Sequence, residues 1–157
     1  MNLDEKKAKN FAFKILSKKF KGIELKWIME HCREVLNCCS MLSKEKDVEV
    51  INLRIAAWVH DIGRVISEEE HPRKSLELLK KEFGEINEKI EDCILNHQVL
   101  GTPKTKEGKI FQVADKMSLL SPKLFVLYAK EDKEGAINFF RKEIDKFFEL
   151  SKKFDFN

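Results

Sequence analysis

Four histidines, His31, His60, His71 and His97, are the only ones among the 157 residues of the chain, and His60 is followed directly by Asp61. A run of apolar residues precedes this His-Asp pair, where a carboxylate without a partner would be costly to bury. Neutral imidazole and carboxylate are the ligands that hold catalytic first-row divalent metals. A metal cation would supply the partner that this carboxylate needs.

Helical spacing places further ionisable residues on apolar faces. His31 lies three residues after Ile28 and four before Val35. His97 and Asp115 lie three or four residues from apolar side chains in the same way. We therefore expect five ionisable side chains from four segments to converge in the interior, namely His31, His60, Asp61, His97 and Asp115. A shared divalent cation would compensate the cost of burying all of them.

Each of these residues has another interpretation when it is taken alone. His31 could be a packed core histidine, Asp115 could pair with a buried basic residue, and His71 could be a solvated residue in a turn before Pro72. What favours a metal site is their order along the chain: His31, His60-Asp61, His71, His97 and Asp115. Ligands of this kind suit one or two ions of iron, manganese, cobalt, nickel or zinc, while magnesium remains possible.

The elements that must position these residues read as helices throughout. Apolar residues recur at helical spacing, and no alternating stretch is long enough to predict a strand. The expected fold is therefore all-α. Predicted helices run between a cap at Asp4 and a stop at Gly22, and over about 24–43, 48–59, 72–83, 88–98, 106–120, from 122 onward and over 133–153. Asp47, Asn87 and Ser121 are further predicted N-caps.

The length predicts a single domain over 1–157. Its motif-bearing core spans about 24–120, and C-terminal helices over 122–153 are expected to pack on it. The last helix carries four phenylalanines, which form either a lid on the core or the face of a homodimer: Phe139, Phe140, Phe147 and Phe148.

Composition excludes several classes of protein. The apolar stretches are too short to span a bilayer, and residues 1–7 lack the apolar core of a secretory signal. The net charge of +3 is slight and interleaved with acids, which disfavours a dedicated nucleic-acid binder. Four cysteines without framework spacing indicate reduced core residues and a cytoplasmic location: Cys32, Cys38, Cys39 and Cys93.

The order of the histidines and aspartates resembles the HD-domain superfamily of metal-dependent phosphohydrolases, over roughly positions 28–120. The segment His60-Asp61-Ile62-Gly63 is the usual form of its central motif. The resemblance implies an all-α bundle with the metal ligands at one end. It also implies the ligand set: His31, His60, Asp61 and Asp115 match members with one metal, and His71 and His97 match the two histidines that members with two metals add.

The stretch 96–115 resembles a narrower group, the small bacterial HD enzymes that split diadenosine tetraphosphate symmetrically. The matching features are His97, the turn Gly101-Thr102-Pro103, and a helix that ends in Ala114-Asp115. The residues after Asp115 and the short gap between Asp61 and His71 depart from that group. The expected substrate is therefore stated only as a nucleotide or another small phosphate ester or anhydride.

The chemistry that the resemblance implies is hydrolysis by a metal-activated hydroxide. Two cations about 3.5–4 Å apart would share Asp61, which could also accept a proton. Arg64, three residues past Asp61, and Lys116, next to Asp115, are the expected phosphate contacts because their backbones lie beside a ligand. The alternative is a non-catalytic HD module that keeps its metal and senses a nucleotide or docks on a protein partner.

Overall fold

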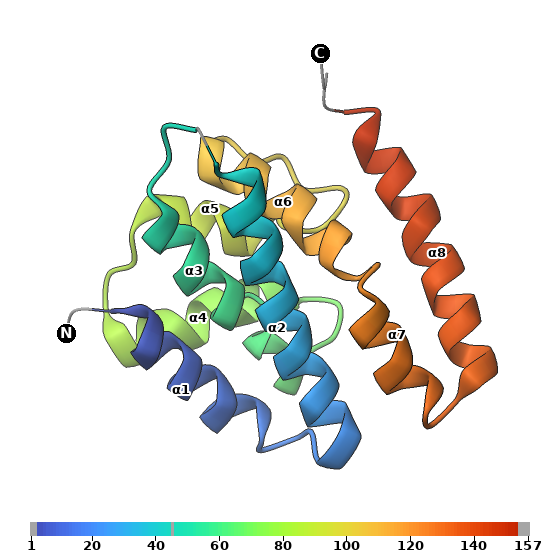
Figure 1. The fold of residues 1–157 in the computed structure, drawn as a ribbon. Helices are drawn as coiled ribbons and strands as arrows, with labels where there is room; N and C mark the ends of the chain where they lie inside the picture. The colour runs from blue at the N-terminus through green and yellow to red at the C-terminus, as the bar shows by residue number, and fades with distance from the viewer. Residues whose placement is uncertain (1–2, 45, 154–157) are drawn as a thin grey trace.

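The computed structural model describes residues 3–44 and 46–153, and these residues form only helices and connecting turns (Figure 1). The all-α fold expected from the sequence is confirmed. In chain order the helices are α1 (Glu5–Leu16), α2 (Gly22–Leu42), α3 (Val50–Val59), a short 3₁₀ helix η1 (Ile62–Val65), α4 (His71–Phe83), α5 (Glu88–Asn96), α6 (Lys106–Ser118), α7 (Pro122–Ala129) and α8 (Lys133–Ser151).

Three of the predicted N-caps are confirmed. The side chains of Asp4, Asn87 and Ser121 each accept a hydrogen bond from a backbone N–H in the first turn of the helix that follows. The prediction for Asp47 was wrong, because α3 begins three residues later and has no side-chain cap. Instead the backbone N–H of Glu49 donates to Glu107 Oε1 of α6 at 2.9 Å. A tertiary contact therefore fixes the start of α3.

The predicted first helix was too long. The α-helix α1 ends at Leu16, and a turn over 17–21 reverses the chain before α2 begins at Gly22. Gly22 has a φ of 52°, which a residue without Cβ adopts at no steric cost. Gly22 thus begins the second helix and does not stop the first, and Phe20 lies in the turn between them.

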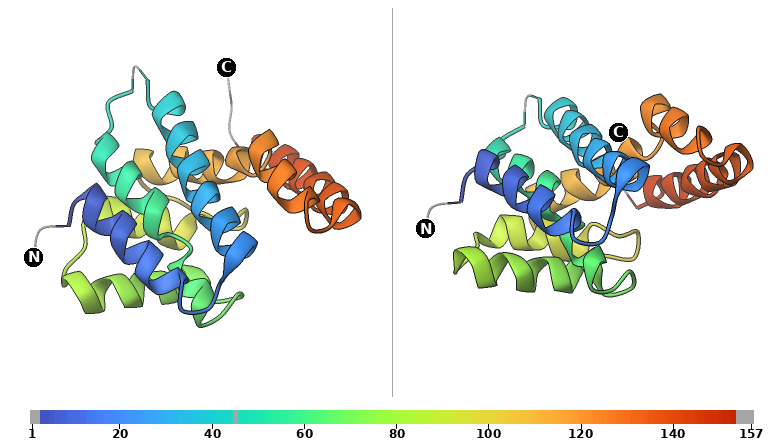
Figure 2. Two further views of the ribbon diagram at one scale, coloured as in Figure 1. Left: turned by 60° about the horizontal axis from the view of Figure 1, so that its bottom comes forward. Right: turned by 90° about the horizontal axis from the view of Figure 1, so that it is seen from below.

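Helices α1 to α6 surround a common core, in which α2 packs along both α3 and α6 and η1 packs on α4 (Figures 1 and 2). Helix α3 is buried on nearly every side, as its apolar sequence indicates. Cys32, Cys39 and Cys93 are buried in this core, and Cys38 is half-buried. No described helix is both long enough and apolar enough to cross a membrane.

The last two helices form a hairpin at one side of the bundle (Figure 2). Helix α7 contacts α2, and α8 contacts α7 and α6. The indole Nε1 of Trp27 in α2 donates to the carbonyl of Leu124 in α7 at 3.2 Å. The ring of Phe139 packs edge-on against Trp27, whereas Phe148 is 61% exposed. The hairpin therefore covers α2 beside the end of the bundle where the histidines gather.

Candidate metal centre

The six residues expected to bind metal meet at one place, and each is almost fully buried. They come from six helices or helix ends: His31 from α2, His60 from the end of α3, Asp61 from the start of η1, His71 from the start of α4, His97 from the end of α5, and Asp115 from α6. Helix ends carry most of them, so that short changes of chain direction aim the side chains inward.

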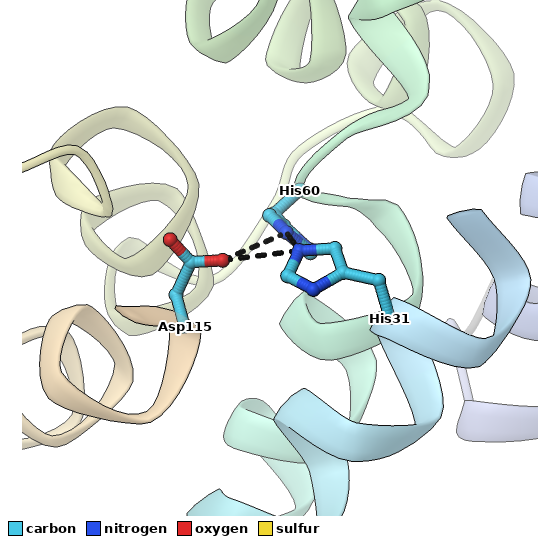
Figure 3. Close-up of side chains that lie close together, drawn as sticks. All are labelled: His31, His60 and Asp115. Atoms are coloured by element: carbon cyan, nitrogen blue, oxygen red, sulfur yellow. Dashed lines mark hydrogen bonds and ion pairs between the residues drawn. The ribbon is translucent and has the colours of Figure 1, made fainter. Parts of the chain in front are cut away.

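One half of the cluster joins His31, His60 and Asp115 (Figure 3). The Nε2 atoms of the two histidines are 3.2 Å apart. Asp115 Oδ1 lies 3.2 Å from Nε2 of His31 and 3.3 Å from Nε2 of His60. Three potential ligand atoms therefore form a nearly equilateral triangle, with Asp61 Oδ2 3.6 Å from His60 Nε2 and 3.7 Å from His31 Nε2.

The other half joins His71, His97 and the second oxygen of Asp61. Asp61 Oδ1 lies 3.1 Å from His71 Nε2 and 3.8 Å from His97 Nε2. The Nε2 atoms of these two histidines are 3.0 Å apart. Asp61 thus presents one carboxylate oxygen to each half.

The histidine rings are held by their other nitrogens. The Nδ1 atoms of His60, His71 and His97 lie 3.1, 2.7 and 2.7 Å from the backbone carbonyl oxygen three residues before each of them. A carbonyl oxygen only accepts, so each Nδ1 carries the proton. In the neutral ring the Nε2 atom then has a free lone pair, which points into the cluster.

His31 is oriented by Ser118 in place of a carbonyl. Ser118 Oγ donates its proton to the Asp115 carbonyl at 2.7 Å, so it accepts from His31 Nδ1 at 3.2 Å. The sequence analysis missed this role of Ser118. The available signal was its position three residues after Asp115, on the same face of α6.

When the rings are neutral, four Nε2 atoms without protons therefore face one another in two close pairs. Two lone pairs cannot form a hydrogen bond, and Asp61 Oδ1 has no hydrogen-bond donor among the described residues. A divalent cation would satisfy all these atoms. Ligand atoms at about 2.0–2.2 Å from a cation such as zinc lie roughly 3.0–3.5 Å from one another, and the separations in the first half fall in that range.

The charges around the cluster favour a cation as well. Burial alone would raise the pKa of the Asp61 carboxyl, but the Arg64 guanidinium beside it holds this pKa well below its usual range. Burial lowers the pKa of His97 to about 3, which keeps its imidazole neutral at physiological pH. Burial would also lower the pKa of His60, yet Asp61 and Asp115 raise it. The two carboxylates thus attract positive charge to this nitrogen, whether a proton or a metal ion brings it.

The backbone at the central motif is held by Ser75, another residue that the sequence analysis missed. Ser75 Oγ of α4 donates to the His60 carbonyl at 2.6 Å and accepts from the Gly63 N–H at 2.8 Å. A Cβ at Gly63 would collide with the backbone of His71 and Ser75. Glycine therefore lets η1 approach the start of α4 closely enough for Asp61 and His71 to meet.

The two predicted phosphate contacts lie beside the ligands. Arg64 Nε is 2.9 Å from Asp61 Oδ2, and its guanidinium also pairs with Glu68. Lys116 Nζ is 2.9 Å from Asp115 Oδ2, and its side chain is 12% exposed. Burial would lower the pKa of Lys116, but Asp115 raises it and keeps the ammonium charged. The guanidinium of Arg64 and the ammonium of Lys116 can therefore contact a phosphate that binds next to Asp61 and Asp115.

A cavity of about 740 Å³ opens onto this side of the centre. His31, Asp61 and Asp115 form part of its wall, together with Arg64 and Lys116. Most of the remaining wall comes from the turn before α2, from α2 itself and from the hairpin of α7 and α8, and Glu68 and Leu119 complete it. Its volume suits a small molecule, which would reach the clustered histidines and aspartates from the side of the hairpin.

The family model described as HD domain matches residues 28–120. That match covers more than half of the chain and contains all six clustered residues. The chain belongs to the HD-domain family. HD domains are generally metal-dependent hydrolases, so the match confirms the family that the sequence resembles.

Two curated proteins are similar to this HD domain. Ribonuclease Y of Lawsonia intracellularis (strain PHE/MN1-00) is 30% identical over 98 residues, which are 60% of this chain and 19% of that protein. Ribonuclease Y of Malacoplasma penetrans (strain HF-2) is 29% identical over 102 residues, which are 60% of this chain and 20% of that protein. The chain thus spans about a fifth of the length of these relatives. No solved structure matches it.

Proposed function

We propose that this HD domain is a phosphohydrolase that uses two divalent transition-metal ions to act on a nucleotide or another small phosphate ester or anhydride. The observation that carries the proposal is the pair of His Nε2–Nε2 contacts, at 3.2 and 3.0 Å, on either side of one buried carboxylate. A site built only for stability would place a donor opposite each acceptor. Here acceptors face acceptors, which supports a cation in each half.

In this proposal His31, His60 and Asp115 would hold one ion, His71 and His97 would hold the other, and Asp61 would contribute to both. When bound, the ions supply an activated water nucleophile near neutral pH and neutralise charge on phosphate oxygens. Asp61 is also placed to accept a proton from the attacking water. The carbonyls behind His60, His71 and His97 and the hydroxyl of Ser118 keep the four rings aimed at the centre.

Arg64 and Lys116 have the role of binding the phosphate. Each is anchored to a carboxylate of the centre, by Arg64 Nε and by Lys116 Nζ. The other N–H groups of the Arg64 guanidinium remain for phosphate oxygens once Glu68 yields to the substrate. The positive charges of Arg64 and Lys116 would orient the reacting phosphate and offset the negative charge that builds up on its oxygens.

The charge of the cavity favours a small substrate over a polynucleotide. Three exposed glutamates line it: Glu24, Glu68 and Glu131. These carboxylates would repel the phosphates of a long RNA strand that flank the reacting one. The two curated relatives are named as ribonucleases, and we propose that this chain shares their centre but acts on a smaller phosphate.

The experiment that tests the proposal is a hydrolysis screen of the purified protein after loading with manganese, iron, cobalt, nickel or zinc. The substrates are nucleoside monophosphates, dinucleotide polyphosphates, cyclic nucleotides and a short single-stranded RNA. We expect metal-dependent release of phosphate or nucleotide from at least one small substrate. Binding of metal without hydrolysis of any substrate would favour the alternative, a non-catalytic HD module that senses a nucleotide or docks on a partner.

A further inference from the structure

Glu143 of α8 is a buried acid that the metal centre does not use. Its carboxylate lines the cavity, and the residue is 3% exposed. Oε1 accepts a hydrogen bond from Lys146 Nζ at 2.7 Å, but Oε2 has no hydrogen-bond donor among the described residues. A buried carboxylate oxygen without a donor is costly, so a donor from outside the chain would be bound strongly at this position.

Aromatic side chains line the same cavity as Glu143 and the metal centre. The Trp27 ring stacks on His31, with centroids 5.7 Å apart and planes inclined by 20°. Phe139 packs edge-on against Trp27 with centroids at 5.8 Å, and Tyr128 lies 5.7 Å from Phe139. Trp27, Tyr128 and Phe139 all line the cavity. This row of rings leads from a metal ligand to the hairpin and offers flat apolar surface to an aromatic ring of a ligand.

We propose that Glu143 is a specificity-determining residue, whose free oxygen accepts a hydrogen bond from an N–H group of a nucleobase. The base would lie against Trp27 and Tyr128 while its phosphate lies at the metal centre beside Lys116. This inference rests on the proposed function and names the part of the substrate that the hairpin recognises. The phosphate would contact residues of the bundle, whereas the base would contact Trp27 of α2 together with Tyr128 and Glu143 of the hairpin, so the hairpin would select among substrates of one chemistry.

The test is the isosteric substitution Glu143→Gln, which keeps the oxygen that faces Lys146 and replaces the free acceptor with an NH₂ donor. The measured quantity is kcat/KM for the best of the four 5′-ribonucleoside monophosphates, divided by kcat/KM for phenyl phosphate. Phenyl phosphate has a ring and a phosphate but no N–H donor. We expect Glu143→Gln to lower this ratio at least about tenfold, the effect of losing a hydrogen bond to a charged group.

The matched control is Glu149→Gln. Glu149 lies on the same helix and also pairs with a lysine three residues later, but it is exposed and outside the cavity. This variant should keep the wild-type ratio. An equal loss of activity on both substrates in Glu143→Gln would show a structural role and overturn the proposal, as would an unchanged ratio. If Glu143→Gln lowered kcat/KM for ribose 5-phosphate, relative to phenyl phosphate, as much as for the nucleotide, the contact would be to a sugar hydroxyl. This result would overturn the assignment to the base.

A second measurement separates this inference from the proposed function. Binding of the four monophosphates to wild type, Glu143→Gln and Glu149→Gln is measured by calorimetry. If the wild type hydrolyses nothing but binds a monophosphate about tenfold more tightly than Glu143→Gln does, the base contact stands without catalysis. Equal binding by wild type and Glu143→Gln, or no binding by the wild type, would overturn the contact even where phenyl phosphate is hydrolysed.

Discussion

The metal centre and the wall formed by Trp27, Tyr128, Phe139 and Glu143 line one cavity and are built differently. In the centre every imidazole has a partner for its Nδ1 atom, and all six clustered residues are at most 3% exposed. In the wall, Trp27, Tyr128 and Phe139 are half-buried, and Glu143 has an oxygen to which no described residue donates a hydrogen bond. The centre is therefore preorganised by its own surroundings, whereas the wall is completed only by a ligand. We infer that the bundle fixes the chemistry and the hairpin fixes the choice of substrate.

The largest effect is expected from a substitution of Asp61 in the metal centre. Asp61→Ala removes the carboxylate whose two oxygens face the two halves of the centre, so we expect hydrolysis to fall by at least about 10³-fold, with several kcal/mol of transition-state stabilisation lost. Steady-state kinetics on the best substrate measures this. Circular dichroism should still show a folded helical protein, and Asp145→Ala, on the exposed face of α8, should retain full activity. Undiminished turnover in Asp61→Ala would refute the site.

Substitution of His71 tests whether each half of the centre binds its own metal ion. His71→Ala should lower the metal content from about two ions to about one per chain and reduce hydrolysis by about 10²-fold, because the second ion loses a ligand. Elemental analysis of protein loaded with metal and dialysed measures the stoichiometry. Anomalous scattering from crystals of the loaded wild type gives an independent answer. A single peak among His31, His60, Asp61 and Asp115 would contradict two ions.

The phosphate contact gives a smaller effect. Arg64→Lys keeps the positive charge but loses the planar donors, so kcat/KM should fall about ten- to hundredfold, the effect of about 1.5–3 kcal/mol. The metal content should stay that of the wild type, which separates substrate binding from loss of the centre. Arg73→Lys is the control, since Arg73 pairs with Glu70 on the exposed side of α4. Equal losses in both variants would remove Arg64 from the proposed machinery.

The smallest effect is expected at Ser118. Ser118→Ala removes the acceptor behind His31 Nδ1, so metal affinity should weaken about tenfold while the protein at saturating metal keeps most of its activity. Competition with a fluorescent chelator measures the affinity. The control is Ser40→Ala in α2, whose hydroxyl donates to the Leu36 carbonyl at 2.9 Å. If both serine variants bound metal as tightly as the wild type, the claim that neighbouring residues preorganise the metal centre would be contradicted.

Much of this protein could be predicted from local patterns. The helical spacing of apolar residues determined the all-α fold, and the caps at Asp4, Asn87 and Ser121 determined where three helices begin, because these signals act within one turn. The inward direction of His31, His97 and Asp115 followed from neighbours three and four residues away. The order of the six candidate ligands needed no tertiary information either.

What the tertiary structure alone decided depends on contacts between distant segments. Helix α3 starts at Val50 because Glu107 of α6 holds the backbone of Glu49, and no local pattern could replace that bond. The two oxygens of Asp61 face different histidine pairs only because η1 approaches α4 closely at Gly63. Glu143 lies on the apolar side of the last helix, but its burial beside the cavity needed the hairpin to fold back over α2. Packing between distant segments sets these positions, and the spacing of residues within one helix carries no information about that packing.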